Sequence, residues 1–555
     1  METYLKLKPS GCKDCYKCIR NCPVKAIRFS ENQAQIIEDE CILCGRCYVV
    51  CPQNAKEVRA DAAAVKTAIR AGKRVVAGIA PSFIAAFDVG GIEDMRQGLT
   101  KLGFADVQET AIGAEFVSRE YEKMLADGQH RVLISSCCPS INTLIQKYYP
   151  DLLGNLAHVL TPMQAHLKSI REREPDAFTV FIGPCIAKKK EADESAWADA
   201  CLTFDEIDAW LIQEGVSLDN TAQETERYRA RLYPTTGGIL HTMNQPEGID
   251  FVAIDGVDNC RSALEELRQG RIDHTFIEMS ACEGSCSAGP ILREHVTHRL
   301  SGAIKVNRYA GDRLYEKSAP ADMSMPLPQT KLHRVMPGSA AIQEVLLRMG
   351  KDKPEKELNC GCCGYPTCRD KAIAVCQGKA EIEMCLPFLK EKAESFSDKI
   401  ISATPNAILV MDETLMVQQI NRAACKLFKL TSAEDILHAP VVRLLDPADY
   451  LSVVSTGKNI VNKCHYIAEY KLFVEETILY DKQYKILISI MRDVTEREMN
   501  REKDNELRKQ TIEVTDKVID KQMRVVQEIA SLLGETTAET KVALTKLKDA
   551  MLNDE

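Results

Sequence analysis

The chain of 555 residues is long enough to form several domains, each with its own apolar core. Its net charge of −9 at pH 7 argues against general nucleic-acid binding, and without a run of about 20 apolar residues we expect no membrane span. The first residues lack the apolar core of a secretory signal, and 23 cysteines in tight clusters favour metal–thiolate chemistry over disulfides. We therefore expect a cytoplasmic protein in an anaerobic setting.

Two similar cysteine runs occupy residues 1–60. Each has the spacing Cys-x2-Cys-x2-Cys-x3-Cys-Pro, typical of bacterial two-cluster ferredoxins, in which the fourth cysteine of each run binds the other cluster. Zinc ribbons also use Cys-x2-Cys pairs, but not four cysteines followed by proline, twice. We therefore expect a ferredoxin-like module with two 4Fe–4S clusters. Cluster one would take Cys12, Cys15, Cys18 and Cys51, and cluster two would take Cys41, Cys44, Cys47 and Cys22.

Residues 72–318 alternate apolar stretches with amphipathic ones, which predicts an α/β domain. A helix over residues 55–72 would link it to the first module. Cysteines follow the predicted strands, where ligands of such sheets collect. The strands are expected within residues 74–82, 131–140 and 178–191, and helices over 114–125 and 141–149.

Four cysteines of this domain lie in turns rich in glycine and small residues that could converge, and four thiolates are what a 4Fe–4S cluster needs. They are Cys138, Cys185, Cys282 and Cys286. The alternative interpretation, buried cysteines as small apolar residues, suits Cys201 and Cys260, which stand alone.

The stretches SSCCPS, GPCIAKKKE and EMSACEGSCSAGP resemble the three motifs of FeFe hydrogenases, in order, and the similarity spans about residues 74–312. The resemblance implies an H-cluster: a 4Fe–4S cube joined to a two-iron unit that carries CO, cyanide and a bridging dithiolate amine. It implies that the four convergent cysteines ligate the cube and that Cys286 also bridges to the two-iron unit.

The resemblance also implies roles for three neighbours. Lys188 would hydrogen-bond one cyanide, and Ser82 would approach the other. Cys137 would pass protons between the bridging amine and the protein, with a thiol pKa near enough to neutrality for exchange. The alternative for Cys137 is a packed neighbour of a ligand.

Several positions depart from the family pattern. The family's proton route uses a glutamate, a serine and a second glutamate, which align with Tyr121, Ala157 and Met124 here. Alanine and methionine have no exchangeable proton and tyrosine titrates near 10, so none can relay protons as the family residues do. Two methionines of the motifs are replaced by Gly183 and Ser280. We therefore expect a site that holds the cofactor but turns over slowly.

The two glutamates next to Tyr121 could substitute for the missing relay. These are Glu120 and Glu122. One helical step, however, points a side chain elsewhere.

A third cysteine cluster lies within residues 335–393 and resembles a small 4Fe–4S domain found in several redox proteins. Its pattern, Cys-x2-Cys-x4-Cys and then a distant cysteine, leaves Cys362 and Cys376 as spares, and zinc is the competing interpretation. The expected ligands are Cys360, Cys363, Cys368 and Cys385.

Residues 396–495 resemble a PAS domain, with an opening strand pair, a helix over 421–428 and a closing strand before the Asp493-Val494-Thr495 ending. A cofactor there could contact some of its cysteines and histidines, although such residues are more often core or surface. The candidates are Cys425, Cys464, His438 and His465.

Residues 496–555 are strongly helical. The apolar seam is that of a coiled coil, interrupted by Thr515 and Gln522; Gly534 should end the first helix and a second should cover 540–552. Without a Gly-rich nucleotide loop after residue 500, output would go to a separate partner or through dimerisation along the coil. The seam residues are Ile512, Ile519, Val526, Ile529 and Leu533.

The sequence thus predicts a multidomain α/β and α+β chain acting as a slow sensory FeFe hydrogenase. It would convert H2 reversibly to two protons and two electrons, with Cys137 accepting the proton. The H-cluster and three further 4Fe–4S clusters would relay redox state to the PAS module. Expected partners are ferredoxin, hydrogenase maturation proteins, a signalling protein and a second copy of the chain. Alternatives are a catalytic ferredoxin-linked hydrogenase and an iron–sulfur scaffold lacking the two-iron unit.

Overall fold

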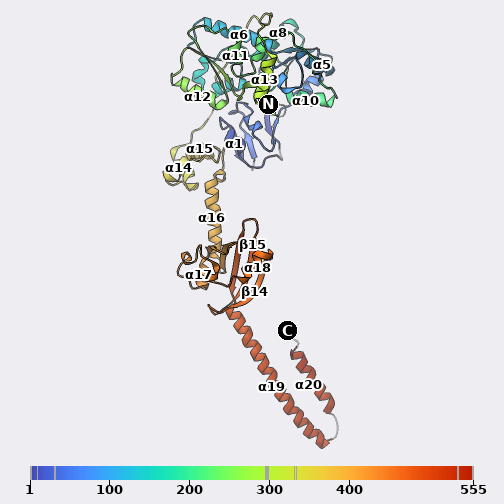
Figure 1. Ribbon diagram of the computed structural model, residues 1–555, viewed down its shortest axis with the longest axis vertical. Helices are drawn as coiled ribbons and strands as arrows, with labels where there is room; N and C mark the ends of the chain where they lie inside the picture. Colours follow the sequence, from blue (N-terminus) through green and yellow to red (C-terminus); the bar gives the residue numbers. More distant parts are fainter. Residues whose placement is uncertain are drawn as a thin grey trace. The chain divides into compact units, whose positions relative to one another are not determined.

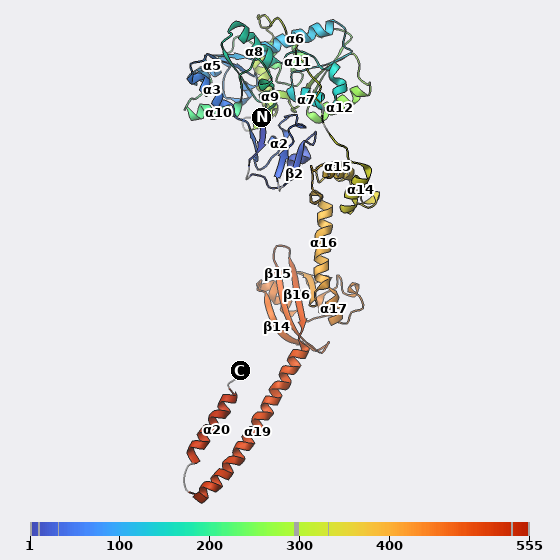
Figure 2. The same ribbon diagram turned by 180° about the vertical axis from the view of Figure 1, so that it is seen from behind.

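The computed structural model divides into two compact units, Met1–Leu389 and Lys390–Glu555, each treated by itself (Figures 1 and 2). The residues that the structure describes are 3–8, 11–30, 33–293, 299–330, 332, 334–533 and 537–552. No helix within these ranges is long and apolar enough to cross a membrane. The fold class is confirmed as multidomain with α/β and α+β parts, whereas the exact domain boundaries stay predictions.

The N-terminal module consists of two small antiparallel pairs and two short helices. Strands β1 (Leu5–Leu7) and β4 (Lys56–Val58) pair, as do β2 (Ile27–Ser30) and β3 (Gln33–Ile36). Helices α1 (Lys17–Asn21) and α2 (Arg46–Val49) each lead toward the last cysteine of a run. The prediction of a helix over all of residues 55–72 is wrong at its start, because β4 finds a partner some 50 residues away. The linking helix is α3 (Ala62–Arg70).

Two parallel sheets form the scaffold of the next region. The first has the order β6-β5-β8-β9 and the second β10-β11-β7. The predicted strands near residues 75, 132 and 178 are confirmed as β5, β7 and β8. The bounds are β5 Val75–Ile79, β6 Asp106–Glu109, β7 Val132–Ile134, β8 Phe178–Gly183, β9 Ala200–Thr203, β10 Asp250–Asp255 and β11 Thr275–Ser280.

Helices surround both sheets (Figure 1). The two predicted helices are confirmed as α6 and α7. The strands β5 and β8 are almost wholly buried, which explains their unbroken apolar sequence. The helices are α4 Phe83–Ala86, α5 Ile92–Lys101, α6 Ala111–Ala126, α7 Pro139–Tyr148, α8 Pro162–Arg173, α9 Ala187–Asp193, α10 Phe204–Gln213, α11 Gly238–Thr242, α12 Val257–Arg268 and α13 Arg299–Tyr309.

The third cysteine cluster lies in a small helical subdomain with α14 (Ser339–Arg348) and α15 (Cys368–Cys376). It packs on the N-terminal module. Lys379 and Arg334 both pair with the buried carboxylate of Glu40, each with a contact of 2.6 Å. The amide of Phe29 also donates to the carbonyl of Lys379 at 3.0 Å. The subdomain is therefore joined to the ferredoxin-like module by polar contacts as well as packing.

The second unit contains a five-stranded antiparallel sheet in the order β13-β12-β16-β15-β14 with helices α17 and α18. The predicted opening pair, helix and closing strand are confirmed as β12, β13, α17 and β16. The bounds are β12 Ala407–Asp412, β13 Val417–Ile420, α17 Arg422–Leu427, α18 Ala448–Thr456, β14 Ile460–Ile467, β15 Leu472–Asp481 and β16 Ile486–Asp493.

Two C-terminal helices follow, α19 (Thr495–Leu533) and α20 (Thr537–Leu552), and an ion pair of 3.0 Å joins Lys548 to Asp516. Of the predicted seam, Ile512 is half-buried, whereas Ile529 is half exposed. Gly534 and the side chain of Leu533 lie outside the described residues. Part of the seam is therefore covered within one chain.

Candidate active site

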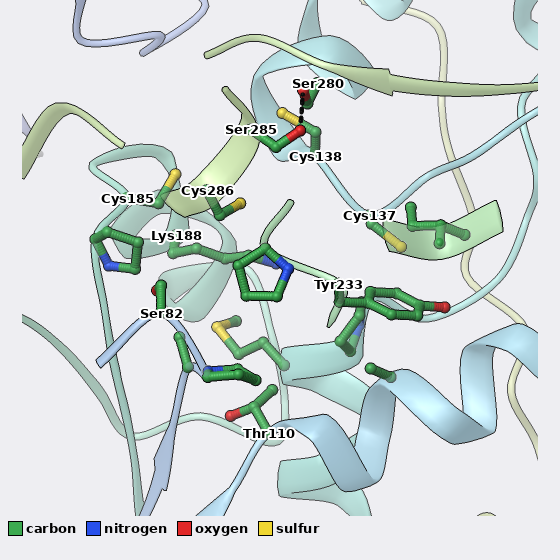
Figure 3. Close-up of a pocket in the computed structure, with 18 of the residues that line it drawn as sticks. Ser82, Thr110, Cys137, Cys138, Cys185, Lys188, Tyr233, Ser280, Ser285 and Cys286 are labelled. Carbon is green, nitrogen blue, oxygen red and sulfur yellow. Dashed lines mark hydrogen bonds between the residues drawn. The ribbon is translucent and has the colours of Figure 1, made fainter. Parts of the chain in front are cut away.

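The carboxyl ends of the parallel strands surround a buried cavity of about 100 Å³ (Figure 3). Ser82 follows β5, Cys137 and Cys138 follow β7, and Cys185 follows β8, while Cys286 lies beyond β11. All five line this one cavity. The sequence places them up to about 200 residues apart, and the strand ends bring them together because parallel strands direct their carboxyl ends to the same edge.

The four predicted cube ligands come together at this cavity. Burial raises the pKa of Cys185 to about 11, with a further rise from the neighbouring charge of Cys138. Burial also raises the pKa of Cys282, and Cys185 and Cys286 add to that rise. Such a set of thiolates is costly without a cationic partner, so the chemistry of the donor set fits an iron–sulfur cluster.

The cavity wall also has polar atoms without partners. The hydroxyls of Ser82 and Thr110 are buried and have no hydrogen-bond partner among the described residues. An unpaired buried hydroxyl costs about 1–3 kcal/mol. Both hydroxyls therefore fit a bound group that presents hydrogen-bond acceptors, as cyanide ligands would.

Lys188 enters the cavity from α9 and is held in place on its far side. Its ammonium donates to Glu191 Oε2 at 2.7 Å, to Glu191 Oε1 at 3.0 Å and to Thr161 Oγ1 at 3.2 Å. Burial disfavours the charged form, but the Glu191 carboxylate outweighs burial, so the pKa of Lys188 is raised. The cavity thus has a fixed positive charge.

Cys137 lies on the cavity next to Tyr121. The Tyr121 hydroxyl lies 3.2 Å from Cys137 Sγ and 3.2 Å from Ser136 Oγ, and it accepts from the Ser136 amide at 2.9 Å. Burial raises the pKa of Cys137 to about 12, although the Tyr121 bond and the Lys188 charge oppose the rise. The expected near-neutral thiol is therefore wrong for this environment, which keeps the thiol protonated.

Glu278 is a cavity residue to which the sequence assigned no role. Its carboxylate accepts three backbone amides: Gly237 at 2.9 Å, Ile239 at 3.0 Å and Leu240 at 3.2 Å. Burial raises its pKa to about 7, and these three bonds oppose the rise. The only signal in the sequence is an acidic residue inside an apolar strand, β11.

The positions that depart from the family pattern are packed in apolar surroundings. Tyr121 and Ala157 are fully buried, and Met124 packs on the same apolar cluster. Glu122 accepts the Asn244 amide at 2.6 Å, and Glu120 pairs with Lys123. Neither glutamate contacts Cys137 among the printed bonds, as expected from their places on the helix.

The two missing methionines have structural counterparts. A β-carbon at Gly183 would lie 2.7 Å from the ring of Phe181, which itself lines the cavity. The Ser280 hydroxyl bonds the Ser285 hydroxyl at 2.9 Å (Figure 3). An aromatic ring and a serine pair therefore line walls where the family has flexible thioethers.

The remaining cysteines gather as the crossed pattern requires. One small cavity is lined by Cys12, Cys15, Cys18 and Cys51, and another by Cys360, Cys363, Cys368 and Cys385. The spare Cys362 and Cys376 are exposed. For the set of cluster two, burial and then the charge of Cys22 raise the pKa of Cys44. Among the described residues, no three ligating side chains are grouped closely enough for a single metal ion.

Family models match four parts of the chain. The model described as the iron-only hydrogenase large subunit, C-terminal domain, matches residues 73–290. A 4Fe-4S dicluster domain matches residues 4–68, an Fe-S cluster model matches residues 357–387, and the PAS fold matches residues 396–502. These matches agree with the predicted order of modules.

Two curated relatives are hydrogenases. The periplasmic Fe hydrogenase large subunit of Nitratidesulfovibrio vulgaris is 25% identical over 285 residues, which is 38% of this chain and 67% of that protein. Iron hydrogenase 1 of Clostridium pasteurianum is 24% identical over 322 residues, 46% of this chain and 56% of that protein. The matched region thus spans about two thirds and just over half of these relatives.

Solved structures give more distant likenesses. An FeFe-hydrogenase from Chlamydomonas reinhardtii is 18% identical and covers 46% of this chain and 91% of its own, with a TM-score of 0.36. The PAS domain of nitrogen regulation protein NR(II) from Vibrio parahaemolyticus is 24% identical and covers 18% and 96%, with a TM-score of 0.16. On the family models, this chain is a PAS-containing member of the iron-only (FeFe) hydrogenases with an N-terminal 4Fe-4S dicluster domain.

Proposed function

We propose that this chain is a sensory FeFe hydrogenase that activates H2 reversibly and slowly and passes the resulting redox state to its PAS module. The observation that carries the proposal is the single buried cavity at which the four cube cysteines, Lys188 and Ser82 meet. A scaffold without a two-iron unit would leave the two unpaired hydroxyls of that cavity unexplained.

When bound, an H-cluster supplies the interconversion of H2 with two protons and two electrons. Cys138, Cys185, Cys282 and Cys286 would hold it. Lys188, fixed by Glu191, offers a positive charge and a donor, and Ser82 offers a free hydroxyl. The apolar remainder of the cavity wall excludes water from the reacting site.

Cys137 would hold and release a proton at Sγ, and its contact with Tyr121 supports this role. The hydrogen bonds beyond it lead from Tyr121 to Ser136, whose hydroxyl donates to the carbonyl of Val159 at 3.1 Å. A carbonyl cannot pass a proton onward, so this chain of bonds is a poor exit route. Slow turnover follows from this arrangement.

The sensory part of the proposal rests on the PAS fold and the helices after it, since such a module has no part in the chemistry of H2. A ferredoxin would exchange electrons with the clusters, maturation proteins would install the two-iron unit, and a separate protein would receive the signal. We further propose a homodimer through the PAS module and helices, a cytoplasmic location, and no nucleic-acid or membrane partner.

The test is turnover after maturation, with H2 oxidation and isotope exchange both measured. We expect exchange between H2 and D2O, with oxidation at least about a hundredfold slower than in a catalytic member assayed alongside, as for loss of proton relay. Equal rates would instead establish the second candidate, a catalytic hydrogenase linked to ferredoxin, which the dicluster domain favours. A lack of any exchange would rule out both.

A further inference from the structure

The cysteines of cluster two lie directly behind the active-site cavity. Gly45 in the second cysteine run has φ +72° and packs so tightly that a β-carbon would lie 2.6 Å from Pro290 and 3.1 Å from Ile186. Those two residues belong to the loops that carry the cavity cysteines. The thiolate of Cys44 also adds to the pKa rise that burial causes at Cys282. Cluster two is therefore the neighbour of the active site.

The small cysteine-rich subdomain packs on another side of the same set. Gly364 has φ +93°, and a β-carbon there would lie 3.1 Å from the Arg20 amide and 3.2 Å from the Ile19 side chain. Arg20 also donates to the carbonyl of Cys362 at 3.4 Å. Both contacts are to α1, which leads directly into Cys22, a predicted ligand of cluster two. The backbone of the subdomain thus lies against the N-terminal module at this point.

Tyr365 occupies the position between the two cysteine sets. It lines the cavity formed by the four cysteines of the subdomain, and it also lines an adjoining cleft of about 370 Å³ that contains Cys22. Burial raises its pKa, and the thiolates of Cys363 and Cys22 add to the rise, which places its hydroxyl near both sets. The side chain is only 4% exposed, and its hydroxyl has no partner among the described residues.

Cluster one has a different environment. The cavity lined by its four cysteines is bordered only by residues of the N-terminal module, from Leu7 to Lys56. No residue of the hydrogenase region or of the small subdomain lines that cavity within the described part of the chain. Cluster one therefore has neither of the two connections that cluster two has.

We propose that cluster two is the junction of the electron path, joining the active site to the small subdomain across Tyr365, with cluster one on a side branch. The source of the electrons rests on the proposed function: each H2 oxidised yields two protons and two electrons. One electron at a time reduces cluster two, which is reoxidised as it reduces the subdomain cluster. The Tyr365 hydroxyl donates a hydrogen bond to a sulfur of one of these two clusters, which raises its reduction potential.

The first experiment uses the full chain assembled with its 4Fe–4S clusters but without maturation proteins, titrated potentiometrically with detection by electron paramagnetic resonance. Tyr365→Phe should shift one of the two clusters to lower potential without changing iron content. Tyr16→Phe, at a tyrosine that lines the cluster-one cavity, should leave both unchanged. A Tyr365→Phe titration identical to that of the natural chain overturns the hydrogen bond.

A second measurement tests the junction itself. In the fully reduced chain, the signal of the subdomain cluster, identified by its loss in Cys368→Ala, should be broadened by a neighbouring spin. Cys15→Ala, which removes a ligand of cluster one, should leave that broadening in place. Loss of the broadening in Cys15→Ala, or its absence from the natural chain, overturns the proposal. The proposed function fails separately, through absence of H2 exchange in the matured protein.

Discussion

The hydrogenase cavity and the PAS core both bury polar groups, but they satisfy them differently. In the PAS module, Glu476 is buried in the sheet, and one of its oxygens accepts from Tyr450 and from Ser489. In the hydrogenase cavity, the buried hydroxyls of Ser82 and Thr110 have no partner among the described residues. The PAS carboxylate is used to hold its own fold together, whereas the cavity hydroxyls are available to a guest.

The largest effect is expected from removing a cavity ligand. Cys185→Ala should lose about four irons per chain and all H2 activation, because three thiolates cannot hold a 4Fe–4S cube firmly. Cys201→Ala, at a buried cysteine that does not line the cavity, is the matched control and should retain iron. Equal iron content in the two variants, measured by metal analysis, would contradict the ligand assignment.

Restoring a proton route should accelerate the enzyme. The combined variant Tyr121→Glu, Met124→Glu, Ala157→Ser should raise H2 oxidation at least about tenfold if proton exit limits the rate. Its control is Glu120→Gln with Glu122→Gln, which should leave the rate unchanged because these side chains bond elsewhere. An unaltered rate in a triple variant that keeps its metal-bound CO and cyanide bands would place the limitation outside the relay.

The PAS side of the comparison is tested by stability. Glu476→Ala should destabilise the module by about 1–3 kcal/mol, because two buried hydroxyls lose their shared acceptor. Glu476→Gln, which keeps one acceptor oxygen, should lose less. The readout is the thermal unfolding of the PAS module within the full chain, and H2 exchange should be unaffected. Unchanged melting of the alanine variant would show that the carboxylate has no structural role.

The pH dependence of Glu278 distinguishes a buried cavity acid from an ordinary carboxylate. Its folded pKa of about 7 lies above the usual value of 4.5. Between these two pH values the folded state keeps a proton that the unfolded state has lost, so stability falls as pH rises. A carboxylic-acid infrared band should disappear with a midpoint near pH 7 and be absent from Glu278→Gln. A carboxyl already ionised at pH 5 would contradict this.

The smallest effect is expected at Ser82. Ser82→Ala should change stability by less than about 0.5 kcal/mol, since no protein hydrogen bond is lost, yet it should shift a cyanide stretching band of the matured protein. Ser489→Ala in the PAS core is the contrasting variant and should cost about 1 kcal/mol. Comparable losses in both variants would remove the distinction between the two regions.

Much of this architecture follows from local sequence. The cysteine spacings predict which thiols share a cavity, and the apolar strands ending in cysteines predict an α/β site. Other features depend on partners distant in sequence: the pairing of Lys56–Val58 with the first strand, the amides that bind Glu278, and the packing of α20 along α19. The raised pKa of Cys137 likewise comes from burial, which spacing alone does not report.

The most direct test of the central claim is the infrared spectrum of the chain after maturation, recorded under H2 and then under argon. The account predicts sharp bands of metal-bound CO and cyanide that shift under H2 and return under argon. A spectrum without such bands, in protein whose 4Fe–4S clusters are complete, would contradict the assignment of the cavity to an H-cluster.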